Sequence, residues 1–87
     1  MSYYVIQDSQ HSSASIFLDR CYKTSKRKWT YFLDFAREFR NKLEAEFFVK
    51  HQKYNHPKVV TKEEAELIDE INQIKFSDLY TTLTTKN

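Results

Sequence analysis

The chain has no glycine and a single proline, Pro57, in 87 residues. Loops that cradle a phosphate need glycine, because the backbone must approach the ligand closely. The P-loop, the dinucleotide-binding fingerprint and the backbone clamp of KH domains are therefore excluded. This absence removes the commonest nucleotide-binding motifs before any other pattern is considered.

Cysteine is nearly as scarce, and long apolar runs are absent. Cys21 is the only cysteine, so no internal disulfide framework can form, and a lone cysteine suits a reducing compartment. No apolar run approaches the ~20 residues that span a bilayer. The N-terminus has neither the basic nor the apolar region of a signal peptide. We expect a soluble cytoplasmic protein without a membrane partner.

Residues that could bind a metal or act as nucleophiles are few. His51 and His56 have a spacing seen in zinc sites, but such a site needs two further ligands from distant positions. Cys21 lies in an apolar segment and is expected to be a small buried residue. The dense glutamates stand at expected helix starts, where the helix dipole accounts for them. We predict no metal, no cofactor, no catalytic residue and a protein that is not an enzyme.

The chain does have the residues of a folded core, since 40% of it is apolar and 16% aromatic. Its length corresponds to one domain. We predict a single compact α+β domain over residues 1–80, followed by a Thr-rich tail at 81–87 that frays. The domain is expected to be a small antiparallel sheet packed against one or two helices. The sheet is expected within residues 3–33, and the helices at about 34–54 and 61–75.

The expected second helix has a well-marked start. Thr61 stands at the cap and Glu64 at the third helical position of a capping box. Residues 58–60 before it could form a short strand. Four residues at helical spacing are expected to give this helix its apolar face: Leu67, Ile68, Ile71 and Ile74.

Residues 30–54 allow two interpretations. Six apolar residues recur at spacings of three and four, which favours one long amphipathic helix from near Thr30. These residues are Trp29, Phe32, Ala36, Phe39, Leu43 and Phe47. In the alternative, residues 29–33 are extended, a short turn follows, and a helix begins at an Asn41 cap with Glu44 three residues later. The pattern alone leaves both open.

A family resemblance enters with these same residues. A short N-terminal strand and a Trp-led segment are followed by Ala36-Arg37-Glu38-Phe39 and then by Lys42-Leu43-Glu44-Ala45-Glu46. This order resembles small uncharacterised bacteriophage proteins with an A-x-x-F pattern before a K-x-E-A-E helix start. The resemblance covers about half the chain, chiefly residues 29–50. It implies a compact α+β protein of phage type that disables or diverts a host system, in the host cytoplasm. It assigns no functional residue.

Positive charge gathers beside the only tryptophan. Residues 1–29 carry five Lys and Arg against two Asp, whereas residues 59–87 carry three against six acidic residues. Cations beside exposed rings can hold a phosphate backbone and stack on bases. The alternative interpretation places Trp29 in the apolar stripe, which its spacing favours, and makes the lysines a solvated loop. The candidate contacts are Arg20, Lys23, Lys26, Arg27, Lys28, Trp29, Tyr31, Arg37 and Arg40.

Two functions are consistent with these features. The first is a non-catalytic effector that binds and inhibits a host protein, such as a nuclease or toxin of a defence system, which can itself hold nucleic acid. The second is an accessory protein that binds RNA or single-stranded DNA through residues 20–29. The chain has more rings than one helical face can bury, which favours an exposed surface for a partner protein or a second copy of this chain. The rings in question are Phe35, Phe48, Tyr54, Phe76 and Tyr80.

Overall fold

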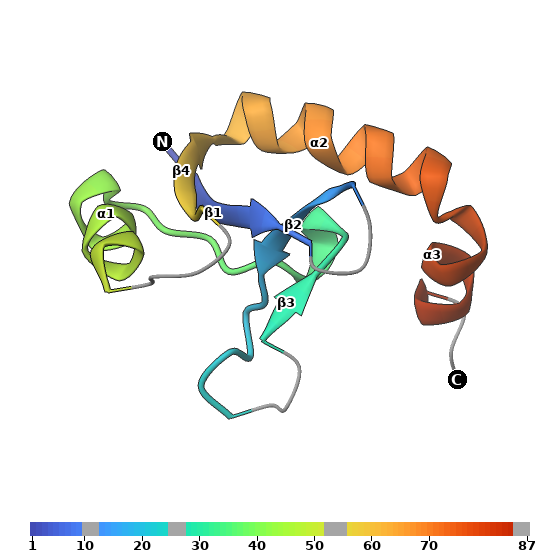
Figure 1. Ribbon diagram of the computed structural model, residues 1–87, viewed down its shortest axis with the longest axis horizontal. Coiled ribbons are helices and arrows are strands. Elements are labelled where there is room, and N and C mark those ends of the chain that lie inside the picture. Colours follow the sequence, from blue (N-terminus) through green and yellow to red (C-terminus); the bar gives the residue numbers. More distant parts are fainter. Residues whose placement is uncertain (10–12, 25–27, 52–55, 85–87) are drawn as a thin grey trace.

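The computed structural model describes residues 1–9, 13–24, 28–51 and 56–84. These residues form a four-stranded antiparallel sheet with three helices around it (Figure 1). The predicted α+β class is confirmed. The strands are β1 (Tyr3–Asp8), β2 (Ser15–Leu18), β3 (Trp29–Thr30) and β4 (Lys58–Thr61), and the helices are α1 (Lys42–Lys50), α2 (Lys62–Lys75) and α3 (Ser77–Thr84), with a 3-10 turn, η1, at Leu33–Phe35.

The sheet has the order β3–β2–β1–β4. Its first three strands lie within residues 3–33, where the sequence predicts an antiparallel sheet, and they form a meander. The short strand expected at 58–60 is also present, and it completes the sheet by pairing with β1, where Tyr4 lies opposite Val60. Because β4 lies between α1 and α2 in the chain, this pairing draws both helices onto the sheet.

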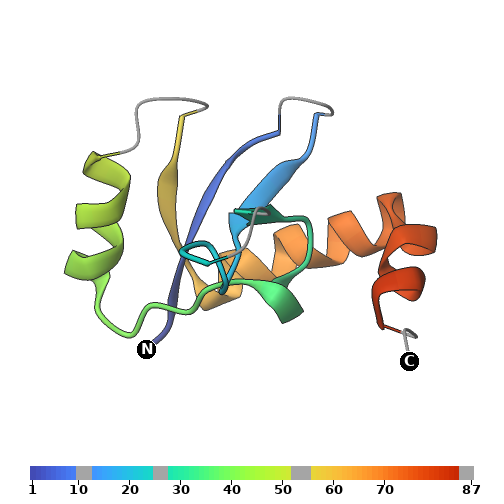
Figure 2. The same ribbon diagram turned by 90° about the horizontal axis from the view of Figure 1, so that it is seen from below.

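Each face of the sheet carries its own apolar cluster, because successive side chains of a strand point to opposite faces. Tyr4, Ile6, Phe17 and Val60 pack with Ala65 of α2. Val5, Leu18 and Phe39 pack with Ala45 of α1. Figure 2 shows the strands running between α1 on one side and α2 behind them. The two helices thus cover two separate faces.

The long helix from Thr30 is wrong, and the alternative with a shorter helix is correct. Residues 29–30 are a strand, residues 33–35 a 3-10 turn, and α1 spans only Lys42–Lys50. Asn41 caps it, but its side chain accepts a hydrogen bond from the amide of Leu43 and not from that of Glu44. The stretch before α1 is extended because its backbone pairs with β1 and β2, which satisfies its amides without a helix.

Helix α2 begins as predicted, but it faces the sheet with a different side. The amide of Glu64 donates to the Thr61 hydroxyl at 3.3 Å. Of the four residues expected on its apolar face, Ile68 packs against the core. Leu67, Ile71 and Ile74 lie outside it, with 63%, 53% and 75% of their surface exposed.

The side of α2 that is buried centres on an asparagine. Asn72 is 1% exposed, and its amide nitrogen donates to the carbonyls of Ser15 and Tyr31, at 2.9 and 2.8 Å. Those carbonyls belong to the start of β2 and to the residue after β3. One turn earlier, the Asp69 carboxylate accepts the amide of Leu33 at 2.9 Å. These polar contacts, together with the packing of Ala65 and Ile68 against the sheet, therefore orient this helix.

The expected tail begins inside a helix, since residues 81–84 form the last turn of α3 and residues 85–87 lie outside the described chain. Helix α3 is tied to η1, because the Tyr80 phenol donates to the Asp34 carboxylate at 2.5 Å. The ring of Tyr80 also packs edge-on against buried Phe32, with centroids 4.8 Å apart. These contacts hold the second half of the chain against the meander.

Replacing Asn72 with Ala is expected to lower the free energy of unfolding by about 2–3 kcal/mol, because the buried side chain is lost and two partly buried carbonyls lose their donor. Urea denaturation measures this change. Glu66→Gln, at an exposed position of the same helix, is the control and should stay within about 0.5 kcal/mol of the parent. Equal losses in both variants would contradict the anchoring role of Asn72.

Stability is expected to fall at alkaline pH through two tyrosines. The hydrogen bond to Asp34 raises the pKa of Tyr80 above its usual 10.0, and burial raises the pKa of Tyr4. Because the folded chain holds these protons more tightly than the unfolded chain, their contribution is complete below pH 10 and is lost above it. Urea denaturation at several pH values from 8 to 11 should show that the free energy of unfolding falls less steeply with pH for Tyr80→Phe than for the parent. The same pH dependence in both proteins would contradict the role of Tyr80.

Candidate binding groove

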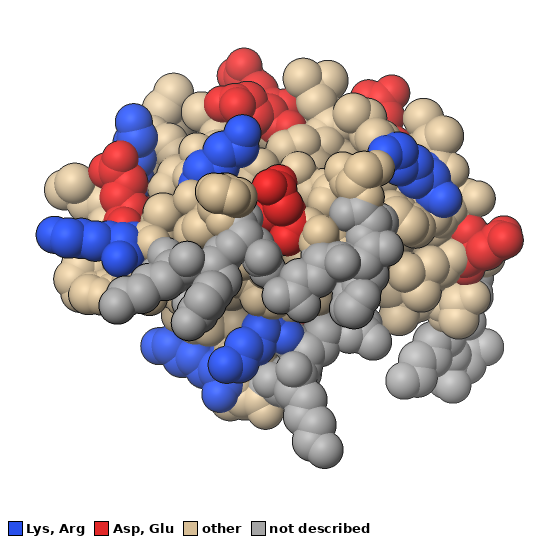
Figure 3. All heavy atoms as spheres, in the orientation of Figure 1, with Lys and Arg blue, Asp and Glu red and all other residues tan. Residues whose placement is uncertain are grey.

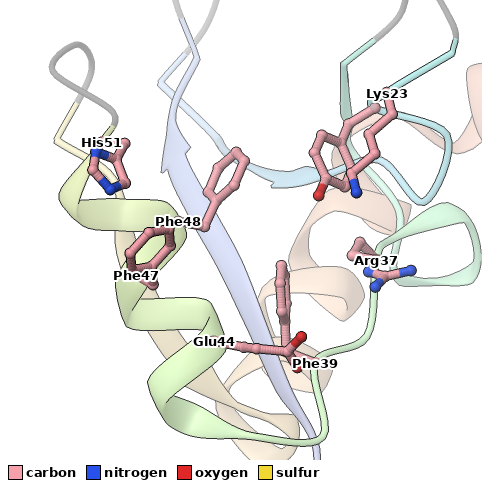
Figure 4. Close-up of a pocket in the computed structure, with 8 residues that line it drawn as sticks. Lys23, Arg37, Phe39, Glu44, Phe47, Phe48 and His51 are labelled. Carbon is pink, nitrogen blue, oxygen red and sulfur yellow. The ribbon is translucent and has the colours of Figure 1, made fainter.

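A hollow of about 350 Å³ lies between α1 and the chain that follows β2 (Figure 4). Four aromatic rings line it. On the α1 side, Glu44 and His51 stand at its edge, and on the opposite side stand Lys23 and Arg37. The rings are those of Tyr22, Phe39, Phe47 and Phe48. We call this hollow the groove.

The side of the groove that faces α1 is held in position by backbone hydrogen bonds. The amide of Arg37 donates to the carbonyl of Leu18 at 2.7 Å. Phe39 and Tyr3 exchange two hydrogen bonds, at 2.7 and 2.8 Å. A turn after β2, in which the amide of Tyr22 donates to the carbonyl of Asp19 at 3.1 Å, brings Tyr22 to the same side. The residues that oppose α1 are therefore held by strand and turn backbone.

Phe48 is the central ring of the groove. Tyr22 meets it edge-on with centroids 5.4 Å apart, and Phe39 lies at 6.4 Å. Phe47, its neighbour in sequence, points outward with 66% of its surface exposed and contacts His51 at 4.5 Å. Two adjacent phenylalanines thus have different environments, one half-buried among rings and the other available to a ligand.

The cations at the rim stand over aromatic rings. The Arg37 guanidinium lies 5.6 Å from the Phe39 centroid, and the Lys23 ammonium lies 5.8 Å from that of Tyr22. Such distances allow an attraction between the cation and the ring face. Both side chains are exposed. The rim therefore presents positive charge directly above an apolar floor.

The structure brings only some of the predicted contact residues to this site. Lys23 and Arg37 line the groove. Arg20 is close by, because its amide donates to the Phe35 carbonyl at 2.9 Å on the segment leading to Arg37. Lys28 and Arg40 are exposed but do not line the groove, and Lys26 and Arg27 lie outside the described residues.

Of the rings expected to be available for stacking, Tyr22 lines the groove, whereas Trp29 and Tyr31 pack elsewhere. Trp29 is half-buried in β3 and packs against the cluster under α1. The prediction that it belongs to the apolar core is therefore correct, but the prediction that it begins a helix is wrong. Tyr31 packs against Phe76 with centroids 4.4 Å apart, and its hydroxyl lies 3.3 Å from that of Ser9. Both residues are half-buried and line a separate, smaller hollow of about 210 Å³ beside α3, and neither lines the groove.

Sequence reasoning missed Phe39 and His51 as groove residues, and it misjudged which apolar side chains are exposed. Four of the rings expected in excess are half-buried: Phe35, Phe48, Phe76 and Tyr80; Tyr54 lies outside the described residues. The large apolar residues that are exposed on α1 and α2 are instead Leu43, Phe47, Leu67, Ile71 and Ile74, and Met1 and Leu79 are exposed elsewhere. The signal that could have found them is a second apolar stripe on each helix, opposite its alanine.

Charged side chains of both signs are spread over the face seen in Figure 3. Asp and Glu lie along the upper edge, where Figure 1 places α2, and also at the centre and sides. Lys and Arg lie at the left and right and also at the lower edge, near the chain between β2 and β3. Cys21, expected to be buried, is exposed on that turn. Among the described residues, no three His, Cys, Asp or Glu side chains are grouped as a metal site requires.

Comparison with protein-family models, curated proteins and solved structures finds no match for this chain. Within the described residues, the structure contains no helix whose length and apolar character would let it cross a bilayer.

Substituting Phe47 or Phe48 by Ala tests which of the two rings is packed in the fold and which lies on the surface. Phe48→Ala is expected to lower the free energy of unfolding by about 2–3 kcal/mol, because its ring packs with Tyr22 and Phe39. Phe47→Ala should change it by less than about 1 kcal/mol, since the ring is mostly exposed. Chemical denaturation of both variants measures the difference, and a larger loss for Phe47→Ala would contradict the groove geometry.

Proposed function

We propose that this protein is a small non-catalytic effector that binds another protein, and that the groove is its contact site. The observation that carries the proposal is the ring-lined hollow with Lys23 and Arg37 over its rim. Interface centres are enriched in aromatic residues and Arg, and they take up anchoring side chains of the partner. The groove has this composition on a chain of only 87 residues.

The positive charge at the rim favours a partner segment that carries negative charge. Lys23 and Arg37 face one carboxylate, Glu44, across the hollow. An acidic peptide segment that carries one aromatic or large aliphatic side chain fits best, because its anchor enters the hollow and its carboxylates meet the two cations. The exposed ring of Phe47 extends the apolar contact beyond the hollow.

The resemblance to phage proteins makes a host protein the proposed target, and inhibition the proposed outcome. A small binder inhibits by occupying a surface that its target needs, so it requires no chemistry of its own. A nuclease or toxin of a defence system is the kind of target that such a protein would block. Its contact segment is expected to be acidic and to carry an exposed aromatic or aliphatic side chain.

Fluorescence anisotropy with labelled peptides tests the groove directly. The first probe has one tryptophan flanked on each side by two acidic residues, and the second has basic residues in their place. The acidic peptide should bind, and Arg37→Ala should weaken it about tenfold through loss of a charge-assisted contact. Arg40→Ala is the matched control, because Arg40 is exposed but does not line the groove. Preference for the basic peptide, or equal effects of the two substitutions, would overturn the assignment.

A second candidate function is binding of RNA or single-stranded DNA through the chain around residues 20–29. The observation that favours it is the hydrogen bond from the amide of Asp19 to the carbonyl of Lys28, at 2.8 Å, which brings exposed Lys28 beside exposed Arg20. Lys23 is exposed on the same turn. Nucleic-acid binding would be steeply salt-dependent. Titrating the protein with single-stranded RNA at two salt concentrations, beside the peptides, decides between the two functions. Tight RNA binding without peptide binding would replace the first proposal by the second.

A further inference from the structure

Helix α2 has a second apolar face that contacts no other part of the described chain's core. With 3.6 residues per turn, the buried Ala65 and Asn72 lie on one side, and Leu67, Ile71 and Ile74 lie on the opposite side. More than half of the surface of each of these three side chains is exposed. We call them the α2 stripe. In Figure 1, α2 lies along the outer edge of the molecule, so this side can be approached freely.

The spacing within the α2 stripe is that of a helix–helix seam. Leu67, Ile71 and Ile74 are separated by four and then three residues, which are the d, a and d positions of a heptad. Residues at this spacing insert into the matching holes of a facing helix. On α1, the outward pair Leu43 and Phe47 offers only two such residues. The α2 stripe is therefore the more complete surface for a second helix.

The charges beside the stripe indicate which helix fits there. Glu63 and Glu70 occupy the g positions on one side, and Lys75 occupies an e position on the other. All three are exposed. When two copies of one helix run parallel, the g residue of each copy meets the e residue that lies five positions later in the other. Glu70 of each copy then meets Lys75 of its partner, twice in one dimer. An antiparallel pair would instead oppose the glutamates.

We propose that the α2 stripe binds a second copy of this chain, with the two α2 helices parallel and related by a twofold axis. A twofold interface is self-complementary, as the Glu70 and Lys75 pairing requires. The surface goes beyond the proposed function, because the groove lies at α1 and remains free in the dimer. Two copies would thus present two grooves to a target and raise its apparent affinity without any new contact.

The size of the stripe sets the strength of the dimer. Stable interfaces bury about 800 Å² per partner, and three side chains with their flanking residues supply only part of that area. The dimer is therefore expected to be weak, with a dissociation constant in the micromolar range or above. At low concentration the chain should be a monomer.

Sedimentation velocity from about 10 μM to 1 mM tests the proposal. The parent chain should shift from monomer towards dimer over this range, and Ile71→Glu should remain a monomer. Glu70→Lys and Lys75→Glu should each weaken the dimer about tenfold, because each replaces two attractions by two repulsions. The double variant with both reversals should regain the parent's association, since it restores opposite charges across the twofold axis.

Controls separate this surface from the groove and from the fold. Phe47→Ala, on the outward side of α1, should leave the dimer unchanged, and denaturation curves should show all exposed variants folded. A monomer at every concentration overturns the proposal, as does a dimer that Ile71→Glu leaves intact. A dimer that Ile71→Glu abolishes but that the double reversal fails to restore overturns the proposed parallel arrangement of the two α2 helices.

Discussion

The orientation of the C-terminal half of the molecule depends on one buried amide. The side-chain amide of Asn72 donates to the carbonyl of Ser15, at the start of β2, and to the carbonyl of Tyr31, just after β3. These two acceptors lie far from Asn72 in the sequence. A buried carbonyl without a donor is costly, so these two bonds leave α2 little rotational freedom. Asp69 adds a third contact to the amide that opens η1. As a consequence, the apolar residues on the other side of α2 must face outward.

The groove depends on the sheet in a comparable way. Arg37 and Phe39 belong to a segment without regular helix, and pairing with β1 and β2 holds it in place. Helix α1 closes the opposite side because Ala45, a residue with almost no side chain, lets it approach Val5 and Leu18 closely. The groove combines residues from three parts of the chain: the turn after β2, the segment before α1, and α1 with its C-terminal cap. Its apolar floor consists of rings that pack against one another, and its cations lie over two of these rings, so the same contacts stabilise the fold and form the groove.

The two surfaces of the protein have opposite character, and this supports their assignment to different partners. The groove has Lys23 and Arg37 over rings, whereas α2 exposes four glutamates around its stripe. A surface rich in glutamate repels the acidic segment that suits the groove. The proposed dimer requires that a lysine of one copy faces a glutamate of the other, and Lys75 is at the position that would face Glu70. A dimer of this type leaves both grooves accessible to an acidic, apolar segment of a target protein.

Local patterns in the sequence determined the elements whose cause is local. The Thr61 cap, the strands around Val5 and Phe17 and the α+β class follow from capping chemistry and residue preference, which act over a few neighbours. Spacing also suggested a long helix from Thr30, and there backbone pairing with distant strands prevailed over periodicity. Lys23 and Arg37 could be named from charge, but not their meeting with Phe39, Phe48 and His51. Only the tertiary structure decided which side of α2 is buried, because the partners of that side lie far away in sequence: Ala65 and Ile68 pack against the sheet, and Asn72 bonds to carbonyls of the meander.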